Sequence, residues 1–231
     1  AEQLIDGLML RRRLSRLCAA IRRDPAGHKL RQSLLRVELL PYQLDGIAFA
    51  VAAGRAILAD DMGLGKTIQA IGTAELLARQ TDIRRVLVVC PASVKSQWVH
   101  EIGRFSDRSA KTVVGPAAKR SQEYGGEQFF TVCNYEQVLR DLTAIEAHQW
   151  DLIILDEAQR IKNWEAKTAR AIKALESPFA LVLTGTPLEN RIDELYSIVE
   201  FIDSSGLGAI VAAMKQMGRD RRLDLAGLTP A

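Results

Sequence analysis

The sequence predicts an α/β domain with a mostly parallel sheet and helices on both of its faces, preceded by a short helical segment. Six apolar runs of four or five residues alternate along the chain with segments of helical spacing. Strands that are apolar throughout are typical of a parallel sheet whose two faces are both covered. The expected strands are residues 56–59, 86–90, 111–114, 129–132, 152–155 and 180–183. Functional residues are then expected at the carboxyl ends of the strands.

The helical segments divide the chain into three parts. Between the strands, helices are expected at residues 66–79, 94–104, 135–141, 164–175 and 192–202. Residues 3–23 carry apolar side chains at helical spacing, and a short second helix is expected through Leu35. Pro41 and Gly54 are placed to begin and end another helix. We therefore expect a helical segment at residues 1–36, the α/β domain at 37–203, and a truncated or poorly ordered tail at 204–231.

The composition is that of a soluble globular protein. Of the 231 residues, 48% are hydrophobic and 26% are charged. No apolar run approaches the length of about 18 residues that a membrane span needs, and the arginines at positions 11–13 interrupt any leader peptide. The three cysteines lie far apart without CxxC spacing, which is typical of buried thiols in a reducing compartment. These features predict an intracellular protein without membrane association, in a bacterial cytoplasm or nucleoid or in a nucleus, with the cytoplasm favoured.

Positive charge is concentrated at the N-terminus. Residues 1–36 hold nine Lys and Arg against three Asp and Glu, whereas the chain as a whole has a net charge of +3. A basic helix of this kind can contact nucleic acid phosphates. The alternative, that it is the solvated face of an amphipathic helix, is slightly favoured.

A glycine-rich loop between a strand and a helix is the strongest chemical signal. The chain reads Asp60-Asp61-Met62-Gly63-Leu64-Gly65-Lys66-Thr67 directly after the apolar residues 56–59. The glycines let backbone N–H groups approach phosphates, and the helix start adds the positive end of its dipole. Lys66 is expected to reach the β- and γ-phosphates, and the Thr67 hydroxyl to ligate Mg²⁺. The loop departs from the strict GxxxxGK[ST] pattern because Asp60 stands where that pattern has glycine.

Two adjacent carboxylates follow the strand expected at residues 152–155. Asp156 is expected to hold Mg²⁺ through water, and Glu157 to orient or deprotonate the attacking water. An Asp-Glu pair can also be a simple helix cap, but its occurrence with a phosphate loop favours a Walker B element. The expected catalytic residues are therefore Lys66, Asp156 and Glu157, acting on ATP with Mg²⁺.

Several motifs together resemble Swi/Snf-type ATPases, a branch of the superfamily-two helicases. Residues 40–46 resemble the family's Q motif, residues 60–70 its phosphate loop, and residues 89–93 with Trp98 and Glu101 its motif Ia. Residues 134–136 resemble the following strand-end motif, residues 156–159 motif II, and residues 183–190 motif III. Motif II reads DEAQ, where His is commoner than Gln at the last position. The resemblance spans about residues 37–203 and implies a RecA-like P-loop NTPase lobe of a motor that moves along duplex DNA and remodels DNA-bound proteins.

The resemblance also implies roles for individual residues. Gln43 would read the adenine edge, since an amide offers both a donor and an acceptor. The residues that would couple the nucleotide state to lobe movement are Gln159, Thr184, Gly185 and Thr186. The candidate contacts to the nucleic acid backbone are Ser93, Lys95, Trp98 and Asn134. For two of these a structural alternative stands beside the functional one, because Trp98 could be a core residue and Lys95 a solvated lysine.

Motors of this family hold ATP between two RecA-like lobes, and the second lobe carries an arginine finger. No segment after Asp203 resembles that lobe, so we expect it to be absent from this chain. Since an arginine finger contributes about 10³–10⁵ in rate, the isolated chain is expected to hydrolyse ATP slowly or not at all.

Two alternatives stay open. The chain could be a nucleotide- or nucleic-acid-binding module without turnover, or a lobe of another superfamily-two enzyme such as an RNA helicase or a restriction-enzyme motor subunit. The loop at residues 60–65 and the TGTP sequence at residues 184–187 favour the Swi/Snf type.

Overall fold

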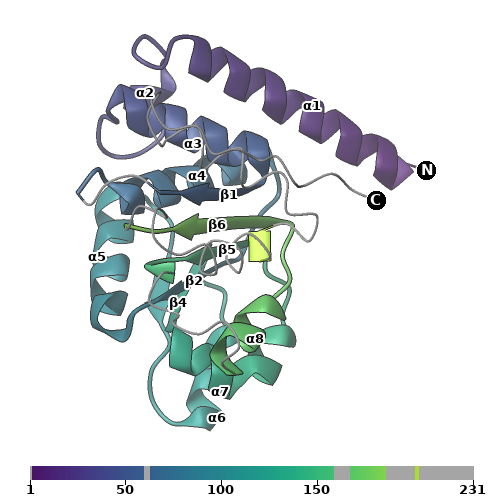
Figure 1. Ribbon diagram of the computed structural model, residues 1–231, viewed down its shortest axis with the longest axis vertical. Coiled ribbons are helices and arrows are strands. Elements are labelled where there is room, and N and C mark those ends of the chain that lie inside the picture. Colours follow the sequence, from purple (N-terminus) through teal and green to yellow (C-terminus); the bar gives the residue numbers. More distant parts are fainter. Residues whose placement is uncertain (1, 60–62, 159–166, 186–200, 203–231) are drawn as a thin grey trace, which may run out of the picture.

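A six-stranded sheet, in which every pairing is parallel, forms the centre of the computed structural model (Figure 1). The structure describes residues 2–59, 63–158, 167–185 and 201–202. The strand order is β1-β6-β5-β2-β4-β3. The strands are β1 (Arg55–Leu58), β2 (Val86–Cys90), β3 (Ala110–Thr112), β4 (Phe130–Asn134), β5 (Leu152–Leu155) and β6 (Phe179–Leu183). Strand β6 thus lies between β1, which leads into the phosphate loop, and β5, which leads into the acidic pair.

Helices cover both faces of this sheet. Figure 1 shows the N-terminal helices along one side and the helices from the second half of the chain on the other. The first group comprises α1 (Glu2–Arg23), α2 (Leu30–Ser33), α3 (Pro41–Ala53), α4 (Lys66–Gln80) and α5 (Lys95–Phe105), the last preceded by the 3₁₀ turn η1 (Ala92–Val94). The second group comprises α6 (Ala117–Tyr124), α7 (Tyr135–Glu146) and α8 (Lys167–Lys173).

The apolar strands supply two separate hydrophobic cores because successive side chains point to opposite faces of the sheet. In β2, Val86 and Val88 belong to the core under α3, α4 and α5, whereas Leu87 and Val89 belong to the core under α7 and α8. All residues of β2 and β5 are buried, as expected for central strands of a covered parallel sheet.

Helix α1 is part of the first core. Leu14, Cys18 and Ile21 are buried in the same cluster as the apolar residues of α3 and α4. At its C-terminal end, Arg22 forms an ion pair of 3.0 Å with Asp45 of α3. The basic segment therefore packs on the α/β domain through one apolar face, while the arginines at positions 11, 12, 16 and 23 are exposed.

Most expected elements agree with the structure to within a few residues. The strands expected at 86–90 and 152–155 have the bounds predicted. Helix α7 runs five residues beyond its expected end and has non-helical backbone angles at Asp141. Helix α6 was not expected, because most of its eight residues are polar. Of the expected helix at 192–202, only residues 201–202 are among the described residues, and the expected tail at 204–231 lies wholly outside them. None of the described helices is long and apolar enough to cross a membrane.

Candidate functional site

The phosphate loop joins the end of β1 to the start of α4. Gly63 and Gly65 have φ angles of 86° and 77°, a region that residues with a Cβ rarely adopt. Lys66 is the first residue of α4, and Lys66 and Thr67 are half-buried. The described part of the loop, residues 63–65, therefore has the positive φ angles typical of a phosphate-binding turn, at the amino end of a 15-residue helix. Asp60, Asp61 and Met62 lie outside the described residues.

Helix α3 supports the loop through two neighbouring side chains. The Gln43 amide accepts a hydrogen bond from the Leu40 backbone N–H at 3.0 Å and donates one to the Leu64 carbonyl oxygen at 3.4 Å. The Tyr42 hydroxyl donates to the same carbonyl at 3.2 Å. Gln43 thus lies directly against the phosphate loop, and its expected contact with adenine stays a prediction.

Asp156 directly follows the carboxyl end of β5, where two aromatic side chains donate hydrogen bonds to it. The Trp98 indole Nε1–H donates to Asp156 Oδ2 at 2.8 Å. The Tyr135 hydroxyl donates to the Asp156 backbone oxygen at 2.7 Å. Burial raises the pKa of the Asp156 carboxyl above its ordinary value, and the Trp98 hydrogen bond and the Lys66 charge oppose that rise.

Glu157 has a φ of 53°, and it is the one non-glycine residue of the described chain with positive φ. This left-handed backbone is unfavourable for a side chain with a Cβ, and strain of this kind concentrates at functional sites. The separate roles expected for Asp156 and Glu157 stay a prediction. Gln159 lies outside the described residues.

Thr184 follows β6 between the two strands that carry the phosphate loop and the acidic pair. Its backbone N–H donates to the Leu58 carbonyl oxygen at 3.1 Å, and its side chain is 1% exposed. Within the described part of the chain, its hydroxyl oxygen is buried without a hydrogen-bond partner. Thr184 therefore contacts the end of β1, which leads into the phosphate loop, and its expected role in coupling stays a prediction. Gly185 is half-buried beside it, and Thr186 lies outside the described residues.

These residues fit a Mg²⁺-nucleotide. The described residues contain no group of three or more side chains that would hold a metal by themselves. Mg²⁺ does not need such a group, because it is bound by one or two side chains together with substrate phosphates and water. The Thr67 hydroxyl, in the first turn of α4, and the Asp156 carboxylate, directly after β5, are side chains of that kind.

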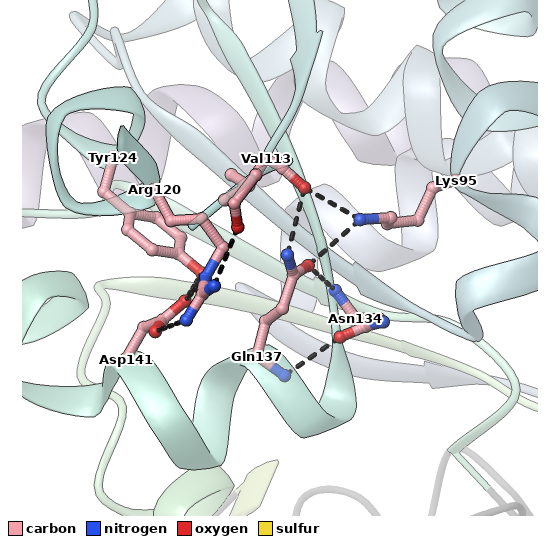
Figure 2. A network of polar contacts seen from close by, with 8 residues as sticks. Lys95, Val113, Arg120, Tyr124, Asn134, Gln137 and Asp141 are labelled. Carbon is pink, nitrogen blue, oxygen red and sulfur yellow. Dashed lines mark hydrogen bonds and ion pairs between the residues drawn. The ribbon is translucent and has the colours of Figure 1, made fainter. Parts of the chain in front are cut away.

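Two of the four candidate nucleic-acid residues, Lys95 and Asn134, make internal contacts beside the end of β4 (Figure 2). The Lys95 ammonium donates to the Val113 carbonyl oxygen at 2.8 Å and to Gln137 Oε1 at 3.1 Å. The Asn134 side chain caps α7 by accepting from the Gln137 backbone N–H at 2.9 Å. Lys95 is therefore not the freely solvated lysine considered above, and Asn134 has a structural role of its own.

The other two candidates differ sharply in exposure. Ser93 is exposed in η1, where a phosphate could reach it. Trp98 is 2% exposed, so the structure places it in the core, the alternative considered above, rather than on a surface that nucleic acid could contact.

Comparison with known proteins assigns the family. The profile of the SNF2-related domain matches residues 42–222. The chain belongs to the SNF2-related family. It is 34% identical over 190 residues to the DNA repair and recombination protein RAD54B of Gallus gallus, covering 74% of this chain and 21% of that protein. It is 36% identical over 177 residues to the Chromodomain-helicase-DNA-binding protein 1-like of Mus musculus, covering 72% of this chain and 20% of that protein.

A solved structure agrees with this assignment. The Sulfolobus solfataricus SWI2/SNF2 ATPase core in complex with dsDNA superposes with a TM-score of 0.68 at 33% identity, covering 78% of this chain and 39% of that one. The RecA-like fold expected from the motifs is thereby confirmed. This SNF2-related chain spans about a fifth of the two relatives and about two fifths of the solved core.

Two contacts of the SNF2-related site lack a sequence signal strong enough to predict them. Tyr42 and Tyr135 occur inside motifs, but nothing in their spacing indicates that one touches the phosphate loop and the other the backbone of Asp156. Both contacts join residues 21 or 22 positions apart, so they depend on how the strands are ordered in the sheet.

Proposed function

We propose that this chain is the ATP-binding lobe of a DNA-dependent ATPase that moves along duplex DNA and remodels DNA-bound proteins. The observation that carries the proposal is the placement of Lys66, Asp156 and Glu157 at one edge of the sheet in a SNF2-related domain. The dsDNA in the solved SWI2/SNF2 core supports duplex DNA as the track. The protein is then expected in the compartment that holds the DNA.

Different residues bind the phosphates, hold Mg²⁺ and activate the attacking water during ATP hydrolysis. The backbone around Gly63 and Gly65 and the start of α4 bind the phosphates, and Lys66 binds the β- and γ-phosphates. Thr67 and Asp156 would hold Mg²⁺, which neutralises charge on the phosphates when it is bound. Glu157 orients the attacking water and accepts its proton.

The remaining roles concern recognition and coupling. Gln43 reads the adenine edge from α3, beside the phosphate loop that it contacts. Thr184, Gly185, Thr186 and Gln159 transmit the nucleotide state to the neighbouring lobe. The second RecA-like lobe completes the ATP site and supplies the arginine finger, so hydrolysis by the first lobe alone is slow or undetectable.

Steady-state ATP hydrolysis by the full-length protein, with and without duplex DNA, tests this proposal. Lys66→Ala should abolish DNA-stimulated turnover, because it removes the charge that binds the β- and γ-phosphates. Single-stranded DNA and duplex RNA, each at the same nucleotide concentration, are tested in place of duplex DNA. Both are expected to stimulate ATP hydrolysis less than duplex DNA does. Unchanged turnover in Lys66→Ala would overturn the proposed chemistry, whereas stimulation by RNA alone would favour a different helicase class.

A further inference from the structure

The metal-binding carboxylate is held by side chains that belong to neither the phosphate loop nor the acidic pair. Trp98 comes from α5 and donates its indole N–H to Asp156 Oδ2 at 2.8 Å. Tyr135 comes from the start of α7 and donates its hydroxyl to the Asp156 backbone oxygen at 2.7 Å. One contact orients the carboxylate and the other holds the backbone that carries it.

The indole is suited to this task because it can only donate. Its single N–H occupies one carboxylate oxygen and leaves the other oxygen of Asp156 for a different partner. Trp98 is 2% exposed and packs in the core with Ile102 and Phe105 of the same helix. The donor is therefore fixed in place before any ligand binds, and it limits the orientations that the carboxylate can adopt.

The same two helices carry the candidate nucleic-acid residues. Helix α5 begins at Lys95, and α7 begins directly after Asn134. The hydrogen bond of 3.1 Å from Lys95 to Gln137 Oε1 joins the two helices near their starts (Figure 2). A displacement of the start of α5 or α7 would therefore change the hydrogen bond that Trp98 or Tyr135 donates to Asp156.

We propose that Trp98 is a positioning residue for the metal-binding carboxylate of Asp156, and that together with Tyr135 it links the candidate nucleic-acid edge of the sheet to the nucleotide site. The inference rests on the proposed function, since it gives Asp156 the role of a Mg²⁺ ligand. Groups that orient metal ligands typically contribute about 10–100-fold in metal affinity or activity.

The chain offers a matched control for this role. Trp150 is also buried, at 4% exposed, and its Nε1–H also donates one hydrogen bond, to the Ile145 carbonyl oxygen at 3.0 Å. It precedes β5, whereas Asp156 follows that strand, so the two indoles lie toward opposite ends of β5. Trp98→Phe and Trp150→Phe therefore remove the same group from equally buried positions, and only the first removes it from the nucleotide site.

The experiment measures nucleotide affinity of the full-length protein by calorimetry with a non-hydrolysable ATP analogue. Each variant is titrated in EDTA and over a series of Mg²⁺ concentrations, with melting temperature as a check on folding. Mg²⁺ is expected to increase the affinity for the ATP analogue. Trp98→Phe should raise the Mg²⁺ concentration that gives half of this increase by about 10–100-fold, and it should leave the affinity for the analogue in EDTA unchanged. Trp150→Phe should behave like the wild type, and in an Asp156→Asn background Trp98→Phe should add no further effect.

The outcomes separate this inference from the proposed function. A Mg²⁺ response of Trp98→Phe equal to that of wild type and Trp150→Phe overturns the positioning role. If Trp98→Phe does not fold, the same titration is made with Tyr135→Phe, which removes only the hydroxyl. A higher Mg²⁺ concentration for nucleotide binding in Tyr135→Phe supports the proposed link between the two sites, and an unchanged concentration overturns it. If the wild type binds no nucleotide at any Mg²⁺ concentration, the proposed function itself fails.

Discussion

At the scale of single residues, the phosphate loop depends on two glycines that differ in what surrounds them. A Cβ at Gly65 would lie 2.6 Å from Gln43 Nε2 and 2.9 Å from Ile68 Cγ2, whereas a Cβ at Gly63 would meet no atom of the described residues within 4 Å. Both have positive φ, so alanine at either site is strained. Only at Gly65 does the substitution also push against the side chain that supports the loop.

Gly65→Ala should therefore lower both the free energy of unfolding, by about 1–3 kcal/mol, and the affinity for ATP. Gly63→Ala should have the smaller effect on both. Gly103→Ala in α5 is the control, because its Cβ has open space and helical alanine is favoured over glycine by up to about 1 kcal/mol. Urea denaturation and nucleotide titration measure the two quantities, and equal losses in Gly63→Ala and Gly65→Ala would refute a contribution from Gln43.

At the scale of elements, the start of α7 combines a structural role with a candidate contact to nucleic acid. The Asn134 side chain accepts from the Gln137 backbone N–H, while the Gln137 side chain accepts from the Asn134 backbone N–H at 3.0 Å. This reciprocal capping box stabilises the helix whose first residue, Tyr135, contacts Asp156. Loss of the cap would thus affect stability and nucleic acid binding together.

Two substitutions at Asn134 separate these effects. Asn134→Ala should cost about 1 kcal/mol of stability and weaken DNA binding. Asn134→Asp retains an acceptor and places a negative charge where the helix dipole favours it, so stability should be kept while repulsion of phosphates weakens DNA binding. Thermal melting and a DNA titration at two salt concentrations measure both. DNA affinity that follows stability alone, falling in Asn134→Ala and unchanged in Asn134→Asp, would show that Asn134 only caps the helix.

The elements also show what could be predicted from sequence. The strands β2 and β5 are apolar throughout, so their bounds and their central place follow from local pattern. Helix α6 has no such pattern and is anchored instead by Tyr124, whose buried ring packs in the second core. Local sequence cannot indicate an anchor that depends on tertiary packing.

The same distinction holds for the candidate site, where local sequence identifies some residues and tertiary packing determines other contacts. The phosphate loop and the acidic pair are contiguous in sequence, so their residue types identify them directly. Trp98 and Asp156 are 58 positions apart, and their hydrogen bond exists only because β5 pairs with β2 and α5 follows β2. The motif placed Trp98 near the nucleic acid, whereas the packing of α5 turns its indole into the core.

At the scale of the whole molecule, the N-terminal helices share a core with the α/β domain. Cys18 of α1 and Cys90 of β2 are buried in one cluster, and Cys133 of β4 is buried in the cluster on the other face. A boundary after residue 36, as the composition predicts, would cut through the first of these clusters. We therefore expect α1 to unfold together with the sheet.

The three cysteines can test this expectation, because Cys18 reports on α1, whereas Cys90 and Cys133 report on the sheet. Burial raises the pKa of Cys18 to about 11 and that of Cys133 to about 12, and it also raises the pKa of Cys90. The folded thiols hold their protons to higher pH than unfolded thiols do, so their contribution to stability is present below about pH 8.5 and declines as the pH rises further. Pulses of iodoacetamide at pH 8 across a urea series, read by mass spectrometry, should label all three over the same narrow range. Labelling of Cys18 at clearly lower urea than Cys90 and Cys133 would instead show that α1 detaches first, as a separate basic segment would.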